Sequence, residues 1–396
     1  MRVCVVTREY PPFIYGGAGV HVAQLVPRLA ELVFVDVQCL GAPRPGASAH
    51  AEDYPADANA ALRVFGADLG IVADMPQVDV VHSHTWYANL AGHLAGVYQH
   101  IPHVITAHSL EPLRPWKREQ LGGGYELSAW AERTAYEAAS GIIAVSSAMA
   151  DDILSVYPGL EPDKVHVVHN GIDTTEFFAD DATDFTQSIG MDGTRPSVVF
   201  VGRITKQKGL IHLMRAARQL PADTQLVLLA SSPDTPEIAA AFQREYDALT
   251  AQRGRDLIWV QQMAPRAGLR QVLSQATVFA CPSIYEPLGI VNLEAMACQT
   301  AVVASAVGGI PEVVQDGITG SLVAYDPAQE DDPAYQTGFE TRFAEAVNTL
   351  LADPAAARRL GTAGRQRCVD HFSWDTIAQR TVDVYQSSLD RFRAES

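Results

Sequence analysis

The chain has few cysteines, a deficit of cations and no long apolar run. Its five cysteines, an odd number among 396 residues, cannot form a disulfide framework, and we expect buried free thiols in a reducing compartment. The apolar run at residues 3–6 meets Arg8 almost at once and is too short for a signal-peptide core. No other apolar stretch reaches membrane-spanning length. These absences predict a cytoplasmic protein with no membrane partner.

The two signs of charge are unequally represented. Asp and Glu number 46 against 29 Lys and Arg, which gives a formal charge of −17. Nucleic acid and anionic membrane need a broad cationic surface, so neither is expected as a partner. A small anion remains compatible, because a local cluster of cations acts over roughly 10 Å in physiological salt.

Short apolar runs alternate with segments of helical period along almost the whole chain. The length exceeds what one ordinary core needs, so two domains are expected. Runs that are continuously apolar indicate parallel strands covered by helices on both faces. The predicted strands span residues 3–7, 33–39, 78–82, 103–107, 142–146 and 165–169, then 197–202, 225–229, 257–260, 278–281, 301–305 and 321–323. The fold class is therefore α/β, with a doubly wound parallel sheet occurring twice.

A polar stretch of low periodicity separates the two halves. It spans residues 173–196 and is predicted to be a linker. The two Rossmann-like domains then cover residues 1–172 and 197–372. The final segment, residues 373–396, is predicted to be a helix that packs back across the domains. Because such sheets bind ligands at the carboxyl ends of their strands, we expect a cleft between those two edges.

The first candidate site is the glycine-rich run Tyr15-Gly16-Gly17-Ala18-Gly19, between a predicted strand and a predicted helix. Glycines let the backbone approach a phosphate or sugar closely, and a helix N-terminus favours an anion. A plain turn is the structural alternative. A dinucleotide fingerprint is the functional alternative, but residues 8–15 separate the strand from the glycines, and Val22 stands at the third glycine position.

Two further motifs follow predicted strands of the second half. One places Arg203 and Lys208 where a helix opens, and paired cations there can neutralise a diphosphate leaving group without a metal. The other, residues 285–294, places Glu286 in a turn and Glu294 two turns into a helix. Such carboxylates can accept hydrogen bonds from sugar hydroxyls, and the free amides between them can hold a phosphate. A solvated basic turn and ordinary helix acids are the alternatives.

Histidines gather at two predicted strand ends of the first half. His82 and His84 alternate on one strand face, which superficially suits a metal. Spacing places no third ligand, so no metal is expected, and His82 is interpreted as a histidine with satisfied hydrogen bonds. His108 follows the next strand and is better placed to hydrogen-bond a substrate.

The combination of Arg203, Lys208, Glu286 and Glu294 behind a Gly-Gly loop resembles the retaining GT-B glycosyltransferases of family 4. Longer motifs resemble one branch of them, the short actinobacterial glycogen synthases, some of which are described as α-maltose-1-phosphate synthases. These motifs are residues 7–12, 15–21, 82–87, 106–112 and 169–173. The resemblance covers essentially the whole chain. It implies a GT-B fold and a retaining α-1,4-glucosyltransferase that uses ADP-glucose in glycogen or α-glucan biosynthesis, with no cofactor.

The resemblance also implies a role for each matching residue. The first domain would bind the acceptor and the second the nucleotide-sugar donor. The catalytic set would be His108 beside the transferred glucose, Glu286 in contact with it, and the diphosphate-gripping Arg203 and Lys208. The remaining donor contacts would be Gly16, Gly17, Leu288, Gly289, Ile290, Val291 and, on the ribose, Glu294.

The acceptor is less well defined by the resemblance. The larger bacterial glycogen synthases carry a lysine where Ile14 stands and an aspartate where Thr85 stands. We therefore favour glucose 1-phosphate over a glucan chain end. Arg114, Lys117 and Arg118 are expected to bind its phosphate, with a solvated basic loop as the alternative.

Other functions stay open on the sequence alone. They are a GT-B glycosyltransferase with another nucleotide sugar, an NAD-dependent oxidoreductase, and a non-catalytic sugar-binding protein of two α/β domains. The oligomeric state is also open, a homodimer included.

Overall fold

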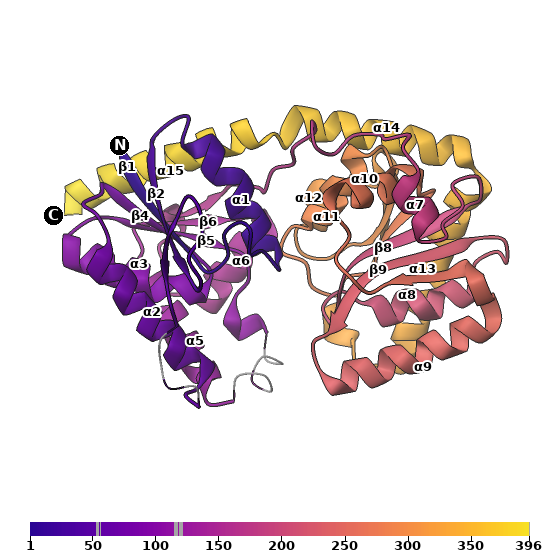
Figure 1. The fold of residues 1–396 in the computed structure, drawn as a ribbon, viewed down its shortest axis with the longest axis horizontal. Helices are drawn as coiled ribbons and strands as arrows, with labels where there is room; N and C mark the ends of the chain where they lie inside the picture. The colour runs from indigo at the N-terminus through magenta and orange to yellow at the C-terminus, as the bar shows by residue number, and fades with distance from the viewer. Residues whose placement is uncertain (53–54, 56, 115–117, 119–121, 396) are drawn as a thin grey trace. The chain divides into compact units, whose positions relative to one another are not determined.

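The structure is a computed structural model that describes residues 1–52, 55, 57–114, 118 and 122–395. Its contacts divide the chain into two units, one formed by Met1–Gly171 with Trp374–Ser396 and the other by Ile172–Ser373. Each unit contains one parallel sheet with helices on both faces (Figure 1). The α/β fold class with two Rossmann-like sheets is therefore confirmed.

The first unit is built on a sheet of order β3-β2-β1-β4-β5-β6-β7. The order reverses between β1 and β4, which is where doubly wound sheets bind ligands. The strands are β1 (Arg2–Thr7), β2 (Phe34–Leu40), β3 (Ser48–His50), β4 (Val80–His84), β5 (His103–Ala107), β6 (Gly141–Ala144) and β7 (Val165–Val167). The helices are α1 (Gly17–Leu29), α2 (Ala60–Asp74), α3 (Trp86–Gln99), α5 (Gly124–Ala138), α6 (Ser147–Val156) and α15 (Trp374–Glu395).

The second unit repeats the plan with a sheet of order β10-β9-β8-β11-β12-β13. Its reversal lies between β8 and β11. The strands are β8 (Ser197–Ile204), β9 (Gln225–Pro233), β10 (Leu257–Val260), β11 (Val278–Cys281), β12 (Ala301–Ser305) and β13 (Gly320–Val323). The helices are α7 (Asp184–Ser188), α8 (Leu210–Ala216), α9 (Pro236–Arg253), α10 (Arg266–Gln275), α11 (Ile290–Ala297), α12 (Ile310–Val313), α13 (Pro333–Ala352) and α14 (Pro354–His371).

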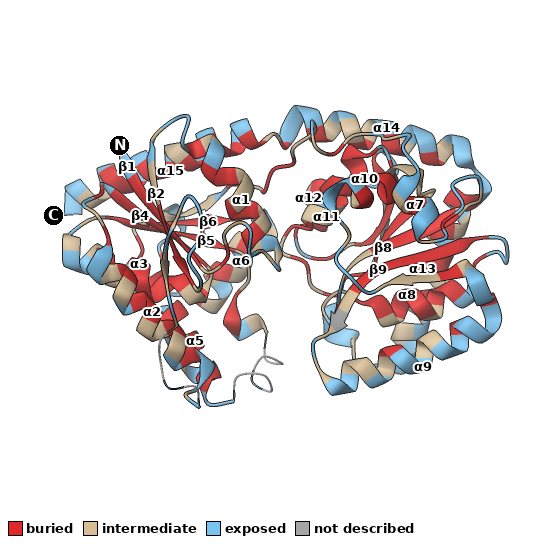
Figure 2. Cartoon of the chain, in the orientation of Figure 1, coloured by how far each residue is buried: buried red, intermediate tan, exposed pale blue. Residues whose placement is uncertain are grey.

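The burial of β1 explains why the strands read as continuous apolar runs. Val3 and Val5 belong to a core shared with α1 and α15, whereas Cys4 and Val6 belong to a core shared with α2 and α3. Successive side chains of a strand point to opposite faces, so both must be apolar when helices cover both faces. Figure 2 shows the central strands buried and the outward face of α9 exposed. The five cysteines are buried free thiols, as predicted.

Polar caps fix where several helices begin. Thr235 accepts a hydrogen bond from the backbone of α9, as Asp332 does for α13 and Asp353 for α14, and a proline follows each cap. The cap satisfies an amide that has no partner within the helix, and proline lacks an amide where none is needed. Across the described residues, we find no helix with the combined length and hydropathy that crossing a lipid bilayer requires.

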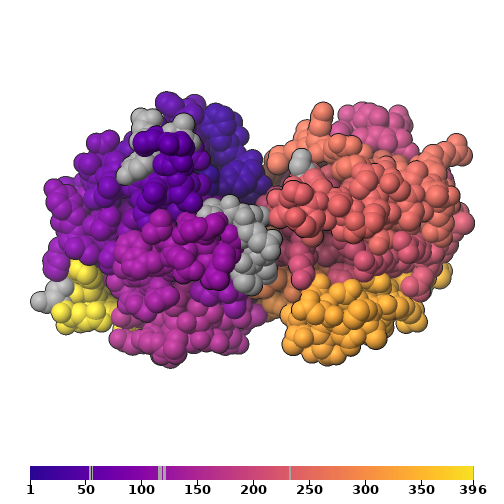
Figure 3. All heavy atoms as spheres, turned by 90° about the horizontal axis from the view of Figure 1, so that it is seen from below, coloured from indigo at the N-terminus to yellow at the C-terminus, as the bar shows by residue number. Residues whose placement is uncertain are grey.

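The ends of the units differ from the predicted boundaries. Residues 173–196, predicted as a linker, lie within the second unit, where α7 contacts α10. The polar composition of this stretch gave no indication of such packing. The short α7 is held by hydrogen bonds to side chains of α10, such as the one that the Phe185 backbone amide donates to Gln271. Helix α15 belongs to the first unit, and Figure 3 shows the C-terminal end of the chain, in yellow, against that unit.

Candidate functional site

Three loops meet at the carboxyl edge of the second sheet. The turn after β8 and the loop after β11 are joined by the Ile284 amide, which donates to the Gln207 carbonyl at 2.9 Å. The loop after β11 is joined to the turn after β12 by the Gly309 amide, which donates to the Glu286 carbonyl at 3.0 Å. These backbone bonds hold the two predicted donor motifs together.

Glycines allow the loops to approach so closely. Gly209 has φ +63°, and a Cβ there would lie 1.9 Å from the carbonyl oxygen of Pro282. Gly308 has φ +51°, and a Cβ there would lie 2.0 Å from the carbonyl oxygen of Glu286. A side chain at either position would therefore push apart the loops that carry Lys208 and Glu286.

Lys208 and Glu286 form an ion pair within this unit. Lys208 Nζ lies 2.6 Å from Glu286 Oε2, and the Ser283 hydroxyl donates to the same oxygen at 3.3 Å. Burial lowers the pKa of Lys208, but the neighbouring Glu286 carboxylate, together with Cys281, outweighs burial and leaves that pKa raised. Lys208 is therefore charged at neutral pH and is held in a fixed place.

Arg203 and Glu294 flank this pair in different environments. The guanidinium of Arg203 is 45% exposed and lies 3.1 Å from Asp234 Oδ1. Glu294 is 9% exposed, and burial, followed by the charge of Glu176, raises its pKa to about 7. A carboxyl group in that state can both donate and accept hydrogen bonds, which suits a pair of neighbouring hydroxyls.

Leu288, Gly289, Ile290 and Val291 form the entrance to α11. Gly289 caps the helix with φ +93°, and the helix proper begins at Ile290. The first amides of a helix have no partner inside it, and its N-terminus carries a partial positive charge. The predicted phosphate-binding amides thus lie on the same loop as Glu286.

In the first unit, the glycine-rich loop folds onto a carboxylate. The amides of Tyr15 and Gly16 donate to Glu9 Oε2, both at 2.8 Å. A Cβ at Gly19 would lie 2.5 Å from that oxygen, whereas one at Gly17 would meet nothing within 4 Å. The loop is therefore able to bind an anionic oxygen, and here an internal carboxylate occupies those amides.

Four histidines form a cluster at the carboxyl edge of the first sheet. Nδ1 of His84 lies 3.0 Å from Nε2 of His108, and the His21 ring stands 4.8 Å from the His108 ring. His82 lies behind them, with its ring 4.2 Å from that of His84. His82 is hydrogen-bonded through both nitrogens, to Tyr385 at 2.6 Å and to Thr106 at 2.7 Å, so its interpretation as a satisfied histidine is confirmed.

Burial determines the charge of this cluster. It lowers the pKa of His21 to about 4 and those of His84 and His108 well below their usual value, with neighbouring histidines adding to the effect on the latter two. All three imidazoles are therefore neutral near pH 7.

The loop after His108 carries the predicted acceptor cations. Arg114 is only 14% exposed, donates to the Ser109 hydroxyl at 3.0 Å and lies 3.8 Å from Glu111. Arg118 is 67% exposed and lies 2.9 Å from Glu126. Lys117 is outside the described residues. Arg114 is thus held by buried partners, whereas Arg118, although paired with the exposed Glu126, keeps most of its side chain open to solvent.

Two buried acids tie this loop to α5. Glu132 accepts from the Tyr157 hydroxyl at 2.6 Å and from the Glu111 amide at 2.9 Å. The Glu111 carboxylate accepts from the Ser128 hydroxyl at 3.0 Å. Burial, followed by the charge of Glu111, raises the pKa of Glu132 to about 8. Glu132 is therefore mostly protonated at neutral pH.

The raised pKa of Glu132 predicts a pH-dependent stability. Its pKa is about 8 in the folded chain against 4.5 unfolded, so the folded state binds more protons between these values. The free energy of unfolding should then fall as pH rises through that window, and Glu132→Gln should escape the fall because glutamine keeps both acceptor bonds. One pKa unit corresponds to about 1.4 kcal/mol. Between pH 5 and pH 8, the free energy of unfolding of the variant should therefore rise relative to that of wild type by about 2 kcal/mol or more. Denaturant titrations at both pH values measure this, with Glu126→Gln as an exposed control; parallel curves for wild type and Glu132→Gln would reject the assignment.

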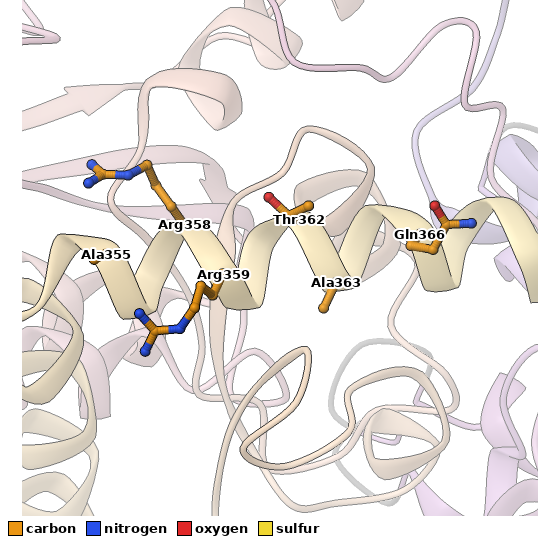
Figure 4. Close-up of a pocket in the computed structure, with 6 residues that line it drawn as sticks. All are labelled: Ala355, Arg358, Arg359, Thr362, Ala363 and Gln366. Atoms are coloured by element: carbon orange, nitrogen blue, oxygen red, sulfur yellow. The ribbon is translucent and has the colours of Figure 1, made fainter.

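A surface hollow of about 600 Å³ lies along α14 and is lined by Ala355, Arg358, Arg359, Thr362, Ala363 and Gln366. Figure 4 shows its two arginines extending away from the helix in different directions. All of its lining residues come from one helix, and none belongs to the predicted site. It therefore adds nothing to the candidate site.

Several site residues escaped prediction because their partners are distant in sequence. Asn170 bonds Nδ1 of His21 at 2.6 Å across 149 residues, and Trp374 packs edge-on against His21 at 5.3 Å. The sequence contained a weak indication that Glu9 and His21 belong to the site, since both flank the glycine-rich loop. Nothing in the local pattern pointed to Tyr385.

Comparisons with known proteins place these features in context. The Glycosyltransferase Family 4 profile matches residues 15–176, and the profile of Glycosyl transferases group 1 matches residues 181–367. The chain is 58% identical over 390 residues to an alpha-maltose-1-phosphate synthase of Mycolicibacterium smegmatis, covering 98% of this chain and 99% of the relative. It is 57% identical, with the same coverage, to an alpha-maltose-1-phosphate synthase of Mycobacterium tuberculosis. A solved sucrose-phosphate synthase from Thermosynechococcus elongatus superposes with a TM-score of 0.77 at 24% identity, covering 97% of this chain and 98% of that one, which shows the fold alone.

Proposed function

This chain belongs to the GT-B glycosyltransferases, with a family 4 segment followed by a group 1 segment, and from that premise we propose that it makes α-maltose 1-phosphate from ADP-glucose and glucose 1-phosphate. The observation that carries the proposal is the similarity, at 57–58% identity over nearly the full length, to two alpha-maltose-1-phosphate synthases. Membership of the family makes the chain an enzyme and removes the NAD-dependent oxidoreductase and the non-catalytic sugar-binding protein from consideration.

We assign the donor diphosphate to Arg203, Lys208 and the amides of Leu288 to Val291. The position of Lys208 supports this role, because a partly buried ammonium fixed by Glu286 is already oriented and needs little reorganisation. Glu286 would accept hydrogen bonds from the transferred glucose, and Glu294 would take the ribose hydroxyls. In the first unit, Gly16 and Gly17 would contact the donor, and His108 would contact the transferred glucose.

The reaction would retain the α configuration. The bond between the glucose C1 and the β-phosphate oxygen breaks, and the acceptor hydroxyl attacks C1 on the same face. The acceptor's proton passes to the departing phosphate, whose charge Arg203 and Lys208 stabilise. Since the two cations supply this stabilisation, the step requires no metal, and full activity in excess EDTA is expected.

The acceptor phosphate is assigned to the basic loop after His108. Arg118 is its most exposed described cation, while Arg114 is partly committed to Glu111 and Ser109. Lys117 lies outside the described residues and keeps its predicted role as part of the proposal. A phosphate on glucose 1-phosphate gives these cations a partner that a neutral glucan chain end lacks.

A comparison of acceptors tests this assignment. We expect ADP release from ADP-glucose to be faster with glucose 1-phosphate than with glycogen. Arg118→Ala should lower kcat/KM for glucose 1-phosphate by about 10-fold, the scale of one lost charge-assisted hydrogen bond, and leave the glycogen rate nearly unchanged. Arg114→Ala should lower both rates, because it also releases the buried Glu111. Equal relative losses in Arg118→Ala for the two acceptors would reject a phosphate-specific role.

A further inference from the structure

The histidine cluster contains a three-ligand arrangement that the catalytic proposal does not use. We propose that His21, His84 and His108 bind a divalent transition-metal ion, Zn²⁺ in the first instance, and that the bound ion inhibits glucosyl transfer. One candidate ligand nitrogen from each of the three histidines lies within 4.8 Å of the others. Tetrahedral zinc with Zn–N bonds of about 2.0–2.1 Å separates its ligand nitrogens by roughly 3.4 Å, so small side-chain movements complete the site.

The three ligands come from separate elements, which is why sequence spacing could not reveal them. His21 lies on α1, His84 ends β4, and His108 follows β5. His21 and His84 are 2% and 1% exposed, and Nε2 of each is buried without a hydrogen-bond partner in the described part of the chain. Such unpartnered nitrogens are costly inside a protein, and a metal ion would satisfy them.

The hydrogen bonds around the cluster decide which nitrogens can bind a cation. Nδ1 of His21 is bonded to Asn170 Oδ1 at 2.6 Å, the kind of partner that orients a metal-binding histidine and leaves its other nitrogen for the ion. His82 is excluded as a ligand because both of its nitrogens are occupied.

Three protein ligands leave a fourth position of a tetrahedral ion open to solvent. His108 is the partly exposed member of the triad and provides the route of entry. The inhibitory effect rests on the proposed function, which gives His108 a contact with the transferred glucose. Zinc ligation takes one nitrogen of His108 and fixes its ring toward the ion, so the imidazole can no longer turn toward the glucose, and the ion acts against the reaction rather than as its cofactor. Binding itself does not depend on the proposed function.

The test is a metal titration of the full chain without an affinity tag. Calorimetry with Zn²⁺ should show one site per chain, and Co²⁺ should give the intense visible absorption of a tetrahedral ion. Loss of an outer-shell partner typically costs 10–100-fold in metal affinity, so His21→Asn and His108→Asn should weaken Zn²⁺ binding by at least about 100-fold. His371→Ala, which removes an exposed histidine of the second unit, should bind as wild type does. Should His21→Asn unfold, as judged by its thermal transition without metal, the variant His108→Asn, at the partly exposed position, decides.

Rates of glucosyl transfer with and without Zn²⁺ distinguish failure of this inference from failure of the proposed function. Zn²⁺ should slow glucosyl transfer by wild type more than 10-fold at saturation, EDTA should restore it, and the ratio of rates with and without Zn²⁺ should approach one in His21→Asn. Absence of stoichiometric binding to wild type, or equal weakening in His371→Ala, would overturn the metal site. An enzyme that binds one Zn²⁺ but transfers no glucose from any donor would overturn the proposed function and leave the metal site standing.

Discussion

Lys208→Ala is expected to lower kcat on the order of 10²–10³-fold, the range for removing one preorganised electrostatic donor from an active site. The substitution removes the ammonium assigned to the leaving diphosphate and leaves Glu286 without its partner at 2.6 Å. Arg203→Ala should fall in the same range if both cations face the diphosphate. Initial rates with saturating ADP-glucose and glucose 1-phosphate measure the effect.

Lys206→Ala provides the matched control for Lys208→Ala. Lys206 belongs to the same turn and carries the same charge, but it is exposed. Its removal changes the net charge equally and should leave kcat within about 2-fold of wild type, as expected for a surface substitution away from the chemistry. A Lys208→Ala enzyme with the turnover of Lys206→Ala would remove Lys208 from the mechanism.

Gly308→Ala is expected to abolish most activity without touching any side chain of the site. Its Cβ would lie 2.0 Å from the carbonyl oxygen of Glu286, so the turn that carries Glu286 must move. A displacement of about 1 Å at a catalytic group can cost on the order of 10²-fold in rate. The variant's rate and its free energy of unfolding should both fall.

Gly317→Ala separates the steric overlap from backbone strain. Gly317 has φ +70°, close to the φ +51° of Gly308, but a Cβ there meets nothing within 4 Å. Both variants therefore share the cost of a left-handed alanine, and only Gly308→Ala carries the overlap with Glu286. Equal rates in the two variants would show that the turn after β12 does not position Glu286.

Periodicity was enough to predict most of the fold. Each predicted strand overlaps an observed one, because strands buried on both faces, such as β11 with its four buried residues, are apolar throughout. Strand β3 was missed because it has three residues, Ser48–His50, and no apolar run. The stretch at residues 173–196 was misleading in another way, since its polar side chains, Asp180 and Asp184 among them, bond to α10 rather than to solvent alone.

Within the candidate site, too, residues of local motifs were predicted and contacts between distant elements were not. Lys208 and Glu286 belong to compact local motifs, so the sequence alone predicted both, and the structure adds that they pair directly. The histidine triad depends on three elements brought together by the sheet. In the sequence, only His82 and His84 stand close enough together to suggest a shared site. The support of His82 by Tyr385 spans 303 residues and required the position of α15. Contacts between distant elements are set by packing, and a single sequence carries no direct record of them.

The identity of the product tests the proposed reaction most directly. ADP-glucose and glucose 1-phosphate are incubated with the enzyme in excess EDTA, and the products are analysed by NMR. Under the proposed function, the products are ADP and a disaccharide phosphate with an α-1,4 linkage, α-maltose 1-phosphate, formed at the rate seen without EDTA. A β linkage, transfer to glucan alone, or loss of activity in EDTA that added metal restores would contradict it.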